Sequence, residues 1–517
     1  MTIEQSASAP TGTRTLPQTG DEYLESIRDG REVWLYGEKV ADVTTHPAFR
    51  NSARSMARLY NAFHDPAIAD RMLKPTDTGS GGLTHPFFRV AHSQQDLRDN
   101  VTAIQTWQEL VFGWMGRTPD YKAALLTSLG QDPEYYGEFA DNARYWYRQA
   151  QENVLFFAHA IANPPVDRGK PIEEVRDVFV HVERETDAGL IVSGAKVVAT
   201  GSPIAQYILV GHTRVEVADK AFALMFVAPV SAPGVKLVAR ASYEEVAART
   251  SSPFDYPLSS RFDENDAVLV FDEALIPWEN VLIYDEAKIF SFIRDSRWTG
   301  RGILQANVRL STKLGFLAGL MNQALEVVGS QNERFANVAL GEMLVNRNVL
   351  NGLRAGMIEH AVPGPGGSME PNPVYASASA AIGPSLQKRS RELAEKFTGS
   401  GLIYLNSLAK DFANPELRPT LDRYLRGSNG KTAIDRSRIM KMLWDAVGSE
   451  FGGRHDLYEQ NYLGQEDVHF MSSHRTALAD GTMSYLEGLV GNAMSDYDLN
   501  GWTAPDLISN DDVDTHR

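Results

Sequence analysis

The sequence predicts an α+β protein in which helical segments enclose one compact block of strands. Three observations carry this prediction: a helical pattern from about 48 to 162, short strand-like runs from about 175, and helical patterns again from about 286 to 497. Strands and helices do not alternate, which argues against a doubly wound parallel sheet. The chain has 517 residues, 43% of them hydrophobic, which is enough for two to four domains or subdomains.

Apolar residues recur at helical spacing in the first helical part. One such stripe includes Phe49, Met56 and Phe63, and a second, over 141–161, includes Trp146. The second helix is expected to run up to the breaker sequence NPP. It would then carry His159 near its C-terminus, where the helix dipole favours a protonated imidazole.

The strand-like part begins with a predicted hairpin. The run DVFVHVERETDAGLIVSGAKVVATG (177–201) reads as two strands joined by a turn at 187–189. The runs YILVGH, FALMFVAPV, VKLVAR and AVLVFDEALIP follow, separated by proline and glycine. The helical part after 286 is interrupted by the loop VPGPGGSMEPNP (362–373).

The composition excludes several classes of protein. The absence of cysteine excludes disulfides, thiolate nucleophiles, zinc fingers and Cys-ligated clusters, and a net charge of -16 argues against a nucleic-acid partner. No apolar run approaches the length of a membrane span. Residues 1–18 lack an apolar signal core and are expected to be a flexible leader. These features predict a cytoplasmic protein with no membrane partner.

The segment GWMGRTPDYKAAL (113–125) places a cation and a phenol at a predicted helix start. Thr118 can cap this helix, and Pro119 suits its first position because proline has no N–H to leave unpaired. Arg117 would then lie just before the helix, on a loop with two glycines, and Tyr121 in its first turn. Both side chains can point at one spot that suits an anion or a phenolate. The alternative is an arginine paired with an acid and a tyrosine packed in the core.

Other motifs give weaker signals. The glycine-rich runs at 79–84 and 363–367 lack the spacing and context of a dinucleotide-binding or phosphate-binding loop. His181 and Glu183 share one face of a predicted strand and, with a third ligand, would form an iron site; a polar, solvent-facing strand explains them more simply. Thr200 and Ser202 can hydrogen-bond a planar ligand or form an ordinary turn. The paired glycines of GSEFGG indicate a close approach to the backbone or a helix break.

Long stretches of the chain, in order, resemble one family. They include GDEYLESIRDGREVWLYGEKVADVTTHPAFRN, TDTGSGGLTHPFF, GWMGRTPDYKAA, HAIANPPVDR, ETDAGLIVSGAKVVATG, DYPLSSRFDENDAVLVFDEALIPWENVL, YLRGSNG and WDAVGSEFGGRHDLYE. Over about 18–506 the chain is similar to the oxygenase components of 4-hydroxyphenylacetate 3-monooxygenase. This resemblance implies an acyl-CoA dehydrogenase-like fold with an N-terminal helical domain (19–160), a β-barrel-like, antiparallel middle domain (161–285), a C-terminal four-helix bundle (286–500) and a tail (501–517). The bundle implies a homotetramer.

The resemblance also implies which residues form the site. Arg117, Tyr121 and His159 would surround the phenolic substrate and carry catalysis. The loop at 211–221, with His212 and Thr213, would shape the end of the pocket that receives the para substituent. No metal is implied. The implied flavin contacts are His159, Ala160, Ile161, Pro165, Val166, Asp167, Arg168, Thr200, Ser202, Ser449, Glu450, Phe451 and Gly452.

The implied reaction is ortho-hydroxylation of a para-substituted phenol, 4-hydroxyphenylacetate or a relative of it, to a catechol through a flavin C4a-hydroperoxide. A separate reductase would supply FADH2, in preference to FMNH2, and O2 would be the second substrate. The substrate reacts best as a phenolate, and full ionisation near neutrality needs a shift of about 3 pKa units, or ~4 kcal/mol. Two alternatives stay open: an acyl-CoA dehydrogenase-like flavoprotein on the same scaffold, and a non-catalytic assembly protein.

Overall fold

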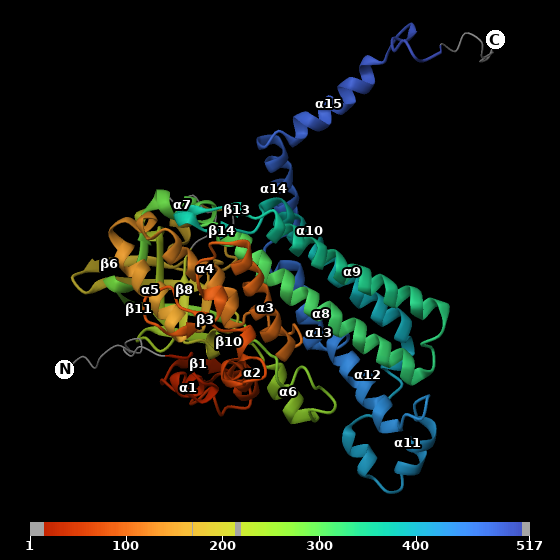
Figure 1. The fold of residues 1–517 in the computed structure, drawn as a ribbon. Helices are drawn as coiled ribbons and strands as arrows, with labels where there is room; N and C mark the ends of the chain where they lie inside the picture. The colour runs from red at the N-terminus through yellow and green to blue at the C-terminus, as the bar shows by residue number, and fades with distance from the viewer. Residues whose placement is uncertain (1–14, 168, 212–218, 509–517) are drawn as a thin grey trace.

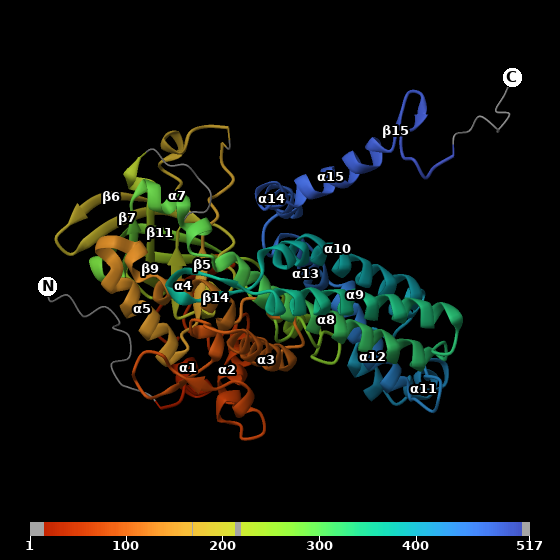
Figure 2. The same ribbon diagram turned by 45° about the horizontal axis from the view of Figure 1, so that its top comes forward.

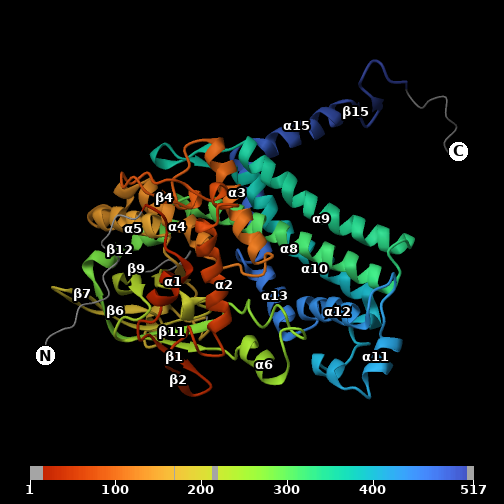
Figure 3. The same cartoon turned by 60° about the horizontal axis from the view of Figure 1, so that its bottom comes forward.

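The computed structural model describes residues 15–167, 169–211 and 219–508. The strands and the N-terminal helices lie together on one side of the molecule, and long C-terminal helices form the other side (Figure 1). The C-terminal helix α15 extends away from this body in all three ribbon views (Figures 1, 2 and 3).

Five helices precede the main strands. Two begin with side-chain caps: Thr19 and Glu22 form a capping box, and Ser93 accepts a hydrogen bond from the backbone N–H of Asp96. The fourth helix is buried along nearly its whole length and packs against both the fifth helix and the long helix α8. The five are α1 (Gly20–Ser26), α2 (Arg50–Asn61), α3 (Gln94–Leu110), α4 (Pro119–Gln131) and α5 (Ala140–Asn153).

Two sheets form most of the β structure. The larger has the order β2-β1-β10-β11-β7-β6 and the smaller the order β12-β9-β8-β5. The larger sheet contains β1 (Glu32–Leu35), β2 (Glu38–Val40), β6 (His181–Thr186), β7 (Gly189–Lys196), β10 (Val235–Ala239) and β11 (Ala267–Pro277). The smaller sheet contains β5 (Phe157–Ala160), β8 (Tyr207–Val210), β9 (Leu224–Pro229) and β12 (Val281–Tyr284).

The predicted hairpin is confirmed as β6 and β7, which pair antiparallel. The sheets differ from an entirely antiparallel block at two places. The first is between β1 and β10, where Val33 pairs with Leu237, and the second is between β5 and β8, where His159 pairs with Leu209; both pairings are parallel. In both pairs the two strands are separated by a long stretch of chain, which leaves room for the crossover connection that parallel strands need.

The C-terminal part is helical, as predicted. The helices α8, α9 and α10 pack against one another, and α12 packs against α8. The elements are α7 (Glu286–Asp295), α8 (Trp298–Val328), α9 (Arg334–Glu359), α10 (Pro373–Thr398), α11 (Arg418–Tyr424), α12 (Ala433–Val447), α13 (Glu450–Asn461), α14 (Glu466–Ala479) and α15 (Thr482–Ser495). Smaller elements are α6 (Tyr243–Thr250) and the pairs β3 (Lys74–Pro75) with β4 (Leu83–Thr84), β13 (Val362–Pro363) with β14 (Met369–Glu370), and β15 (Tyr497–Asp498) with β16 (Gly501–Trp502).

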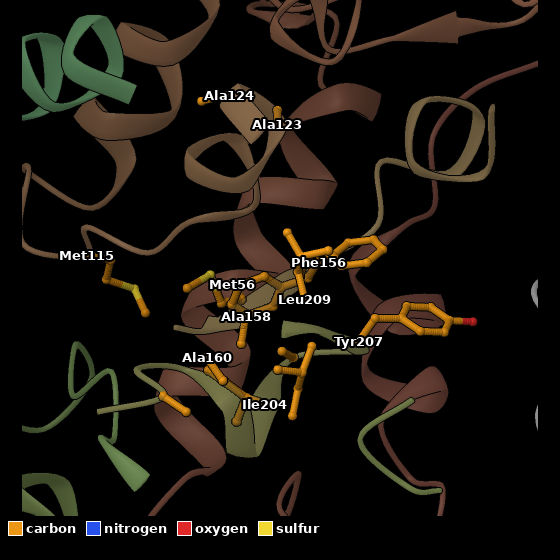
Figure 4. Packing of buried hydrophobic residues seen from close by; sticks show 14 of the residues in the cluster. Met56, Met115, Ala123, Ala124, Phe156, Ala158, Ala160, Ile204, Tyr207 and Leu209 are labelled. Carbon is orange, nitrogen blue, oxygen red and sulfur yellow. The ribbon is translucent and has the colours of Figure 1, made fainter. Parts of the chain in front are cut away.

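One large hydrophobic core joins helices and sheets. Figure 4 shows a part of it, to which α2 contributes Met56, the turn before α4 contributes Met115, and the strands β5 and β8 contribute Ala158 and Leu209. The strand β5 is therefore fixed in a packed interior. This packing gives the side chain of His159, the polar residue of the strand, a defined direction.

The expectation of one helix over 141–161 is wrong. The helix α5 ends at Asn153, where Val154 takes a left-handed conformation with φ of 49°, and the chain then becomes strand β5. The run VLFFAHA is apolar enough for a buried strand and pairs with β8, so tertiary contacts override the helical pattern. His159 therefore lies on a strand, not at a helix C-terminus.

No helix in the described parts of the chain is long and apolar enough to cross a membrane.

Candidate active site

The turn before α4 has the predicted form. Thr118 is the N-cap, Pro119 the first helical residue, and Tyr121 lies in the first turn. The cap differs in detail: the Thr118 hydroxyl donates to the Asp120 carboxylate and accepts from Gln108 Nε2 at 3.0 Å instead of accepting from the helix backbone. Arg117 therefore stands at the N-terminal end of a buried helix, where the helix dipole favours an anion.

The two glycines of this turn permit close packing. Gly113 has φ of 73°, and a Cβ there would lie 2.8 Å from the carbonyl oxygen of Arg309 in α8. A Cβ on Gly116 would lie 2.6 Å from the Tyr458 hydroxyl of α13. Glycine at these positions therefore lets two C-terminal helices close over Arg117.

The guanidinium of Arg117 is enclosed by aromatic rings. Its Cζ lies 4.0 Å from the ring centroid of Tyr121 and 4.2 Å from that of Tyr462, and Nη2 donates to the Tyr462 carbonyl at 3.2 Å. The side chain is only 8% exposed, yet Nε and Nη1 have no hydrogen-bond partner among the described residues. A buried arginine with unused donors is a site for an acceptor that is supplied by a ligand.

His159 of β5 faces the same place. Its ring centroid lies 6.0 Å from that of Tyr121, and its Nδ1 is buried without a partner in the described structure. Burial lowers the pKa of His159 well below its ordinary value, and the charges of Lys122 and Arg117 lower it further. The imidazole is therefore neutral at pH 7 and can accept a hydrogen bond.

A small pocket opens between these groups. Two predicted substrate residues, Tyr121 and His159, and one predicted flavin contact, Ile161, line it, and Arg117 stacks on the Tyr121 ring. The structure thus brings together three of the five predicted substrate residues, while His212 and Thr213 lie outside the described residues. The remaining wall is mostly apolar and consists of Lys122, Leu125, Ile161, Leu209, Gly211, Met225, Phe292 and Trp298.

The sequence analysis missed Glu264, which ties the site together. Its carboxylate accepts the backbone N–H of Arg117 at 2.5 Å and the Arg454 guanidinium at 3.3 Å. Its backbone carbonyl accepts the N–H of Gly201 at 2.7 Å. Glu264 thus connects the arginine turn with the strand end at Thr200. Its motif, FDEND, belongs to the quoted resemblance, but no local pattern marks this position.

The predicted flavin-binding strand ends lie side by side. Ala162, after β5, bridges Val197, after β7, and the N–H of Val197 donates to the Ala162 carbonyl at 3.0 Å. Thr200 donates its hydroxyl to Asp266 at 2.6 Å, whereas the Ser202 hydroxyl is fully buried without a partner in the described ranges. An orphaned hydroxyl beside two strand ends fits a planar ligand with hydrogen-bonding edges, such as a flavin ring.

Other predicted flavin contacts lie in different settings. Pro165, Val166 and Asp167 follow β5 on the surface, and Asp167 pairs with Lys170 at 2.8 Å. Arg168, His212 and Thr213 lie outside the described residues.

The run from Ser449 to Gly452 begins α13. The Ser449 hydroxyl accepts the N–H of Gly452 at 3.0 Å as the N-cap, and the ring of Phe451 packs 5.6 Å from that of Trp114. Glu450 is exposed, and a Cβ on Gly452 would lie 2.8 Å from the Ala446 carbonyl. Within one chain these residues hold α12, α13 and the arginine turn together, and their contact with flavin stays a prediction.

The third ligand of the hypothetical iron site is not found. His181 Nε2 lies 3.2 Å from Glu183 Oε1, and His181 Nδ1 lies 2.8 Å from the Phe179 carbonyl. The described residues contain no group of three or more histidine, aspartate or glutamate side chains placed to hold a metal ion.

Replacing Glu264 with alanine is expected to raise the KM for the phenol by about 10- to 100-fold, because hydrogen bonds to charged groups are worth about 1.5–3 kcal/mol and the Arg117 turn loses one. Steady-state kinetics measure KM and kcat separately. Glu264→Gln keeps one acceptor oxygen, so its KM should lie between those of the wild type and Glu264→Ala. Glu273→Ala, which removes an exposed pair with Arg184, is the matched control. An unchanged KM in a folded Glu264→Ala protein contradicts the positioning role.

The fold and the pocket define a class of protein: α+β proteins with a buried site between the smaller sheet and the helices, beside an enclosed arginine. The chain belongs to the 4-hydroxyphenylacetate 3-hydroxylase family, since the N-terminal model of that family matches residues 19–283 and the C-terminal model residues 291–491. The predicted family and fold class are thereby confirmed.

Relatives at about half identity cover almost the whole chain. The oxygenase component of 4-nitrophenol 2-monooxygenase from Rhodococcus sp is 50% identical over 99% of this chain and 98% of its own length. The 4-hydroxyphenylacetate 3-monooxygenase oxygenase component of Escherichia coli is 50% identical over 96% of both chains. A solved structure of such an oxygenase component, complexed with FAD and 4-hydroxyphenylacetate, superimposes with a TM-score of 0.85 at 29% identity, covering 92% of this chain and 99% of that one. A flavin-dependent monooxygenase component is therefore favoured over the dehydrogenase-like and non-catalytic alternatives.

Proposed function

We propose that this chain is an oxygenase component that hydroxylates a para-substituted phenol next to its hydroxyl group, using reduced FAD from a separate reductase and O2. The observation that supports this most is the buried pocket itself. It joins a neutral histidine and a tyrosine within a mostly apolar wall, and the guanidinium of Arg117, with its unused donors, stacks on that tyrosine. Such a wall accepts a ring, and the polar groups accept one ionisable hydroxyl.

The side chains prepare the phenol for electrophilic attack on its ring. Arg117 favours the phenolate electrostatically, His159 accepts a hydrogen bond from the hydroxyl, and Tyr121 fixes the orientation. The enclosed wall excludes water, which strengthens these interactions. Bound reduced flavin supplies, together with O2, the electrophilic oxygen atom. The flavin would be held by Ala160 and Ile161 after His159 and by Thr200 and Ser202 at the neighbouring strand end.

The test is a reductase-coupled assay with the purified chain, a flavin reductase, NADH, FAD and O2. We expect 4-hydroxyphenylacetate or 4-nitrophenol, the substrates named for the relatives, to yield a catechol in proportion to the O2 consumed. Replacing FAD with FMN tests the cofactor preference. Oxygen consumption without any hydroxylated product from either phenol, combined with reduction of bound FAD by an acyl-CoA, would replace this proposal with the dehydrogenase-like function.

We further propose that the chain assembles as a homotetramer through α14 and α15. The helix α15 has no buried residue, and apolar side chains that include Tyr485, Leu489 and Met494 are half exposed or more. A lone helix with this composition is not stable in water, whereas a second copy can cover it. Light scattering should give four times the chain mass of 57.2 kDa. Leu489→Asp should lower that mass, and a monomeric wild type would contradict the assembly.

A further inference from the structure

A lysine on the wall of the phenol pocket has no role in the function proposed so far. Lys122 follows Tyr121 in α4 and is only 4% exposed. Its Nζ lies 3.7 Å from the centroid of the Tyr121 ring, on the side of the pocket that His159 also lines. Within the described residues Lys122 forms no ion pair and no hydrogen bond. Its contact with a polar residue is the one with the Tyr121 ring.

The charges around this lysine do not balance. The guanidinium of Arg117 also lies over the Tyr121 ring, and the imidazole of His159 is neutral. The carboxylate within electrostatic reach is that of Glu264, and its oxygens already accept from the Arg117 backbone and from Arg454. The other polar groups at Arg117 are the rings of Tyr458 and Tyr462, which are uncharged phenols. A buried lysine on the pocket wall and a buried arginine beside the same tyrosine ring thus lie close together, and among the described residues no carboxylate pairs with the lysine.

An unpaired buried charge costs several kcal/mol, so it is kept only where something compensates for it. The wall around Lys122 is apolar and nearly closed, which leaves little room for water. An anionic ring in the pocket would stabilise the protonated form of Lys122 and would also be attracted by the nearby Arg117. The substrate of the proposed function becomes such an anion when it loses its hydroxyl proton.

We propose that Lys122 is a further catalytic residue of the phenol site: its amine takes the hydroxyl proton of the bound phenol, and the resulting ammonium stays beside the phenolate as its second counter-ion. The O–H bond of the phenol breaks, an N–H bond forms at Nζ, and the pair remains neutral as a whole. This inference rests on the proposed function, because it needs a phenol in the pocket.

The empty pocket favours the amine that this step requires. Burial, and then the charge of Arg117, lower the pKa of Lys122 well below its ordinary value, while Glu264 raises it. A neutral amine accepts a proton, and once an anion is present the ammonium is favoured again. His159 is the competing acceptor, and the experiment must separate the two.

The test follows the ionisation of bound 4-nitrophenol, whose phenol and phenolate forms absorb at different wavelengths, in the absence of flavin and therefore of turnover. The full-length protein is titrated over pH, and the midpoint at which the bound ligand becomes phenolate is recorded. For Lys122→Met we expect this midpoint to rise by about 1–3 pH units, the usual effect of one nearby charge. Lys122→Arg, which keeps a cation but is a poor proton acceptor, should hold the midpoint close to that of the wild type and still lower turnover.

Matched variants make the result decisive. Lys220 also places its ammonium over a tyrosine ring, 4.0 Å from the Tyr284 centroid, but at the surface, so Lys220→Met should leave the midpoint unchanged. Lys122→Met should melt no lower than the wild type, since it removes an unpaired buried amine. A Lys122→Met midpoint equal to that of the wild type, with His159→Asn raising it, overturns the proposal and assigns the step to His159. If wild-type protein does not bind the phenol at all, the proposed function fails instead.

Discussion

Replacing Arg117 with alanine is expected to lower phenol hydroxylation by about 10²–10³-fold, the usual loss when one preorganised electrostatic group is removed from a reacting centre. The variant removes the guanidinium that stacks on Tyr121 and carries two donors without a partner among the described residues. Oxygen consumption should continue, because the pocket wall and the predicted flavin contacts are left in place. The measurement is the ratio of catechol formed to O2 consumed.

Two further variants interpret this result. Arg117→Lys keeps the charge but loses the planar stacking and the forked donors, so it should recover only part of the activity. Arg261→Ala is the control, since Arg261 also stacks on an aromatic ring, 4.6 Å from the centroid of Phe262, but that ring does not line the phenol pocket as Tyr121 does. A folded Arg117→Ala protein with wild-type coupling would remove Arg117 from the mechanism.

Replacing Glu459 with alanine is expected to destabilise the fold by about 3–5 kcal/mol, because it leaves two buried cations without their carboxylate. Arg309 donates twice to Glu459, at 2.5 and 2.6 Å, and Lys313 donates at 2.9 Å; all three side chains are 2% exposed or less. Denaturant unfolding measures the loss. Glu342→Ala breaks an exposed pair with Arg389 and should cost about 0–1 kcal/mol. Equal effects of the two variants would contradict this account.

The same carboxylate predicts a pH dependence. Burial alone would raise the pKa of Glu459, but Arg309 and Lys313 lower it to about 2, below its ordinary value of 4.5. The folded state therefore holds the ionised form more strongly than the unfolded state does. The resulting stability is complete above about pH 4.5 and is lost as the pH falls towards 2. The difference in melting temperature between the wild type and Glu459→Gln should accordingly shrink between pH 6 and pH 3.5.

Local chemistry allowed part of the site to be predicted from the sequence. The helix start at Pro119, with Arg117 before it and Tyr121 after it, follows from capping preferences within five residues. The position of His159 did not follow, because a short apolar run after a helix fits a buried strand as well as one more helical turn. Only the pairing of β5 with β8 decides between them.

Long-range partners set the limit of such prediction. Glu264 lies 147 residues from Arg117 in the chain, and nothing in its own neighbourhood indicates that it accepts the Arg117 N–H. Lys122 stands next to a predicted residue, but whether a helical lysine is solvated or buried depends on α8 and on the sheet, which the local pattern does not contain. The other candidate site residues came from the family resemblance. It gave their positions in the chain but not their contacts in the structure.

The parallel pair of β1 and β10 has a consequence for synthesis of the chain on the ribosome. Val33 and its partner Leu237 are far apart in sequence, so at translation rates of about 5–20 residues per second β1 emerges about 10–40 s before β10 does. During that interval the hairpin of β1 and β2 presents an unpaired strand edge, which is a template for wrong pairing between chains. The nascent protein thus exposes an unpaired strand edge until β10 in its middle third has been made. Slow translation or missing chaperones should therefore reduce the yield of folded protein more than its final stability implies.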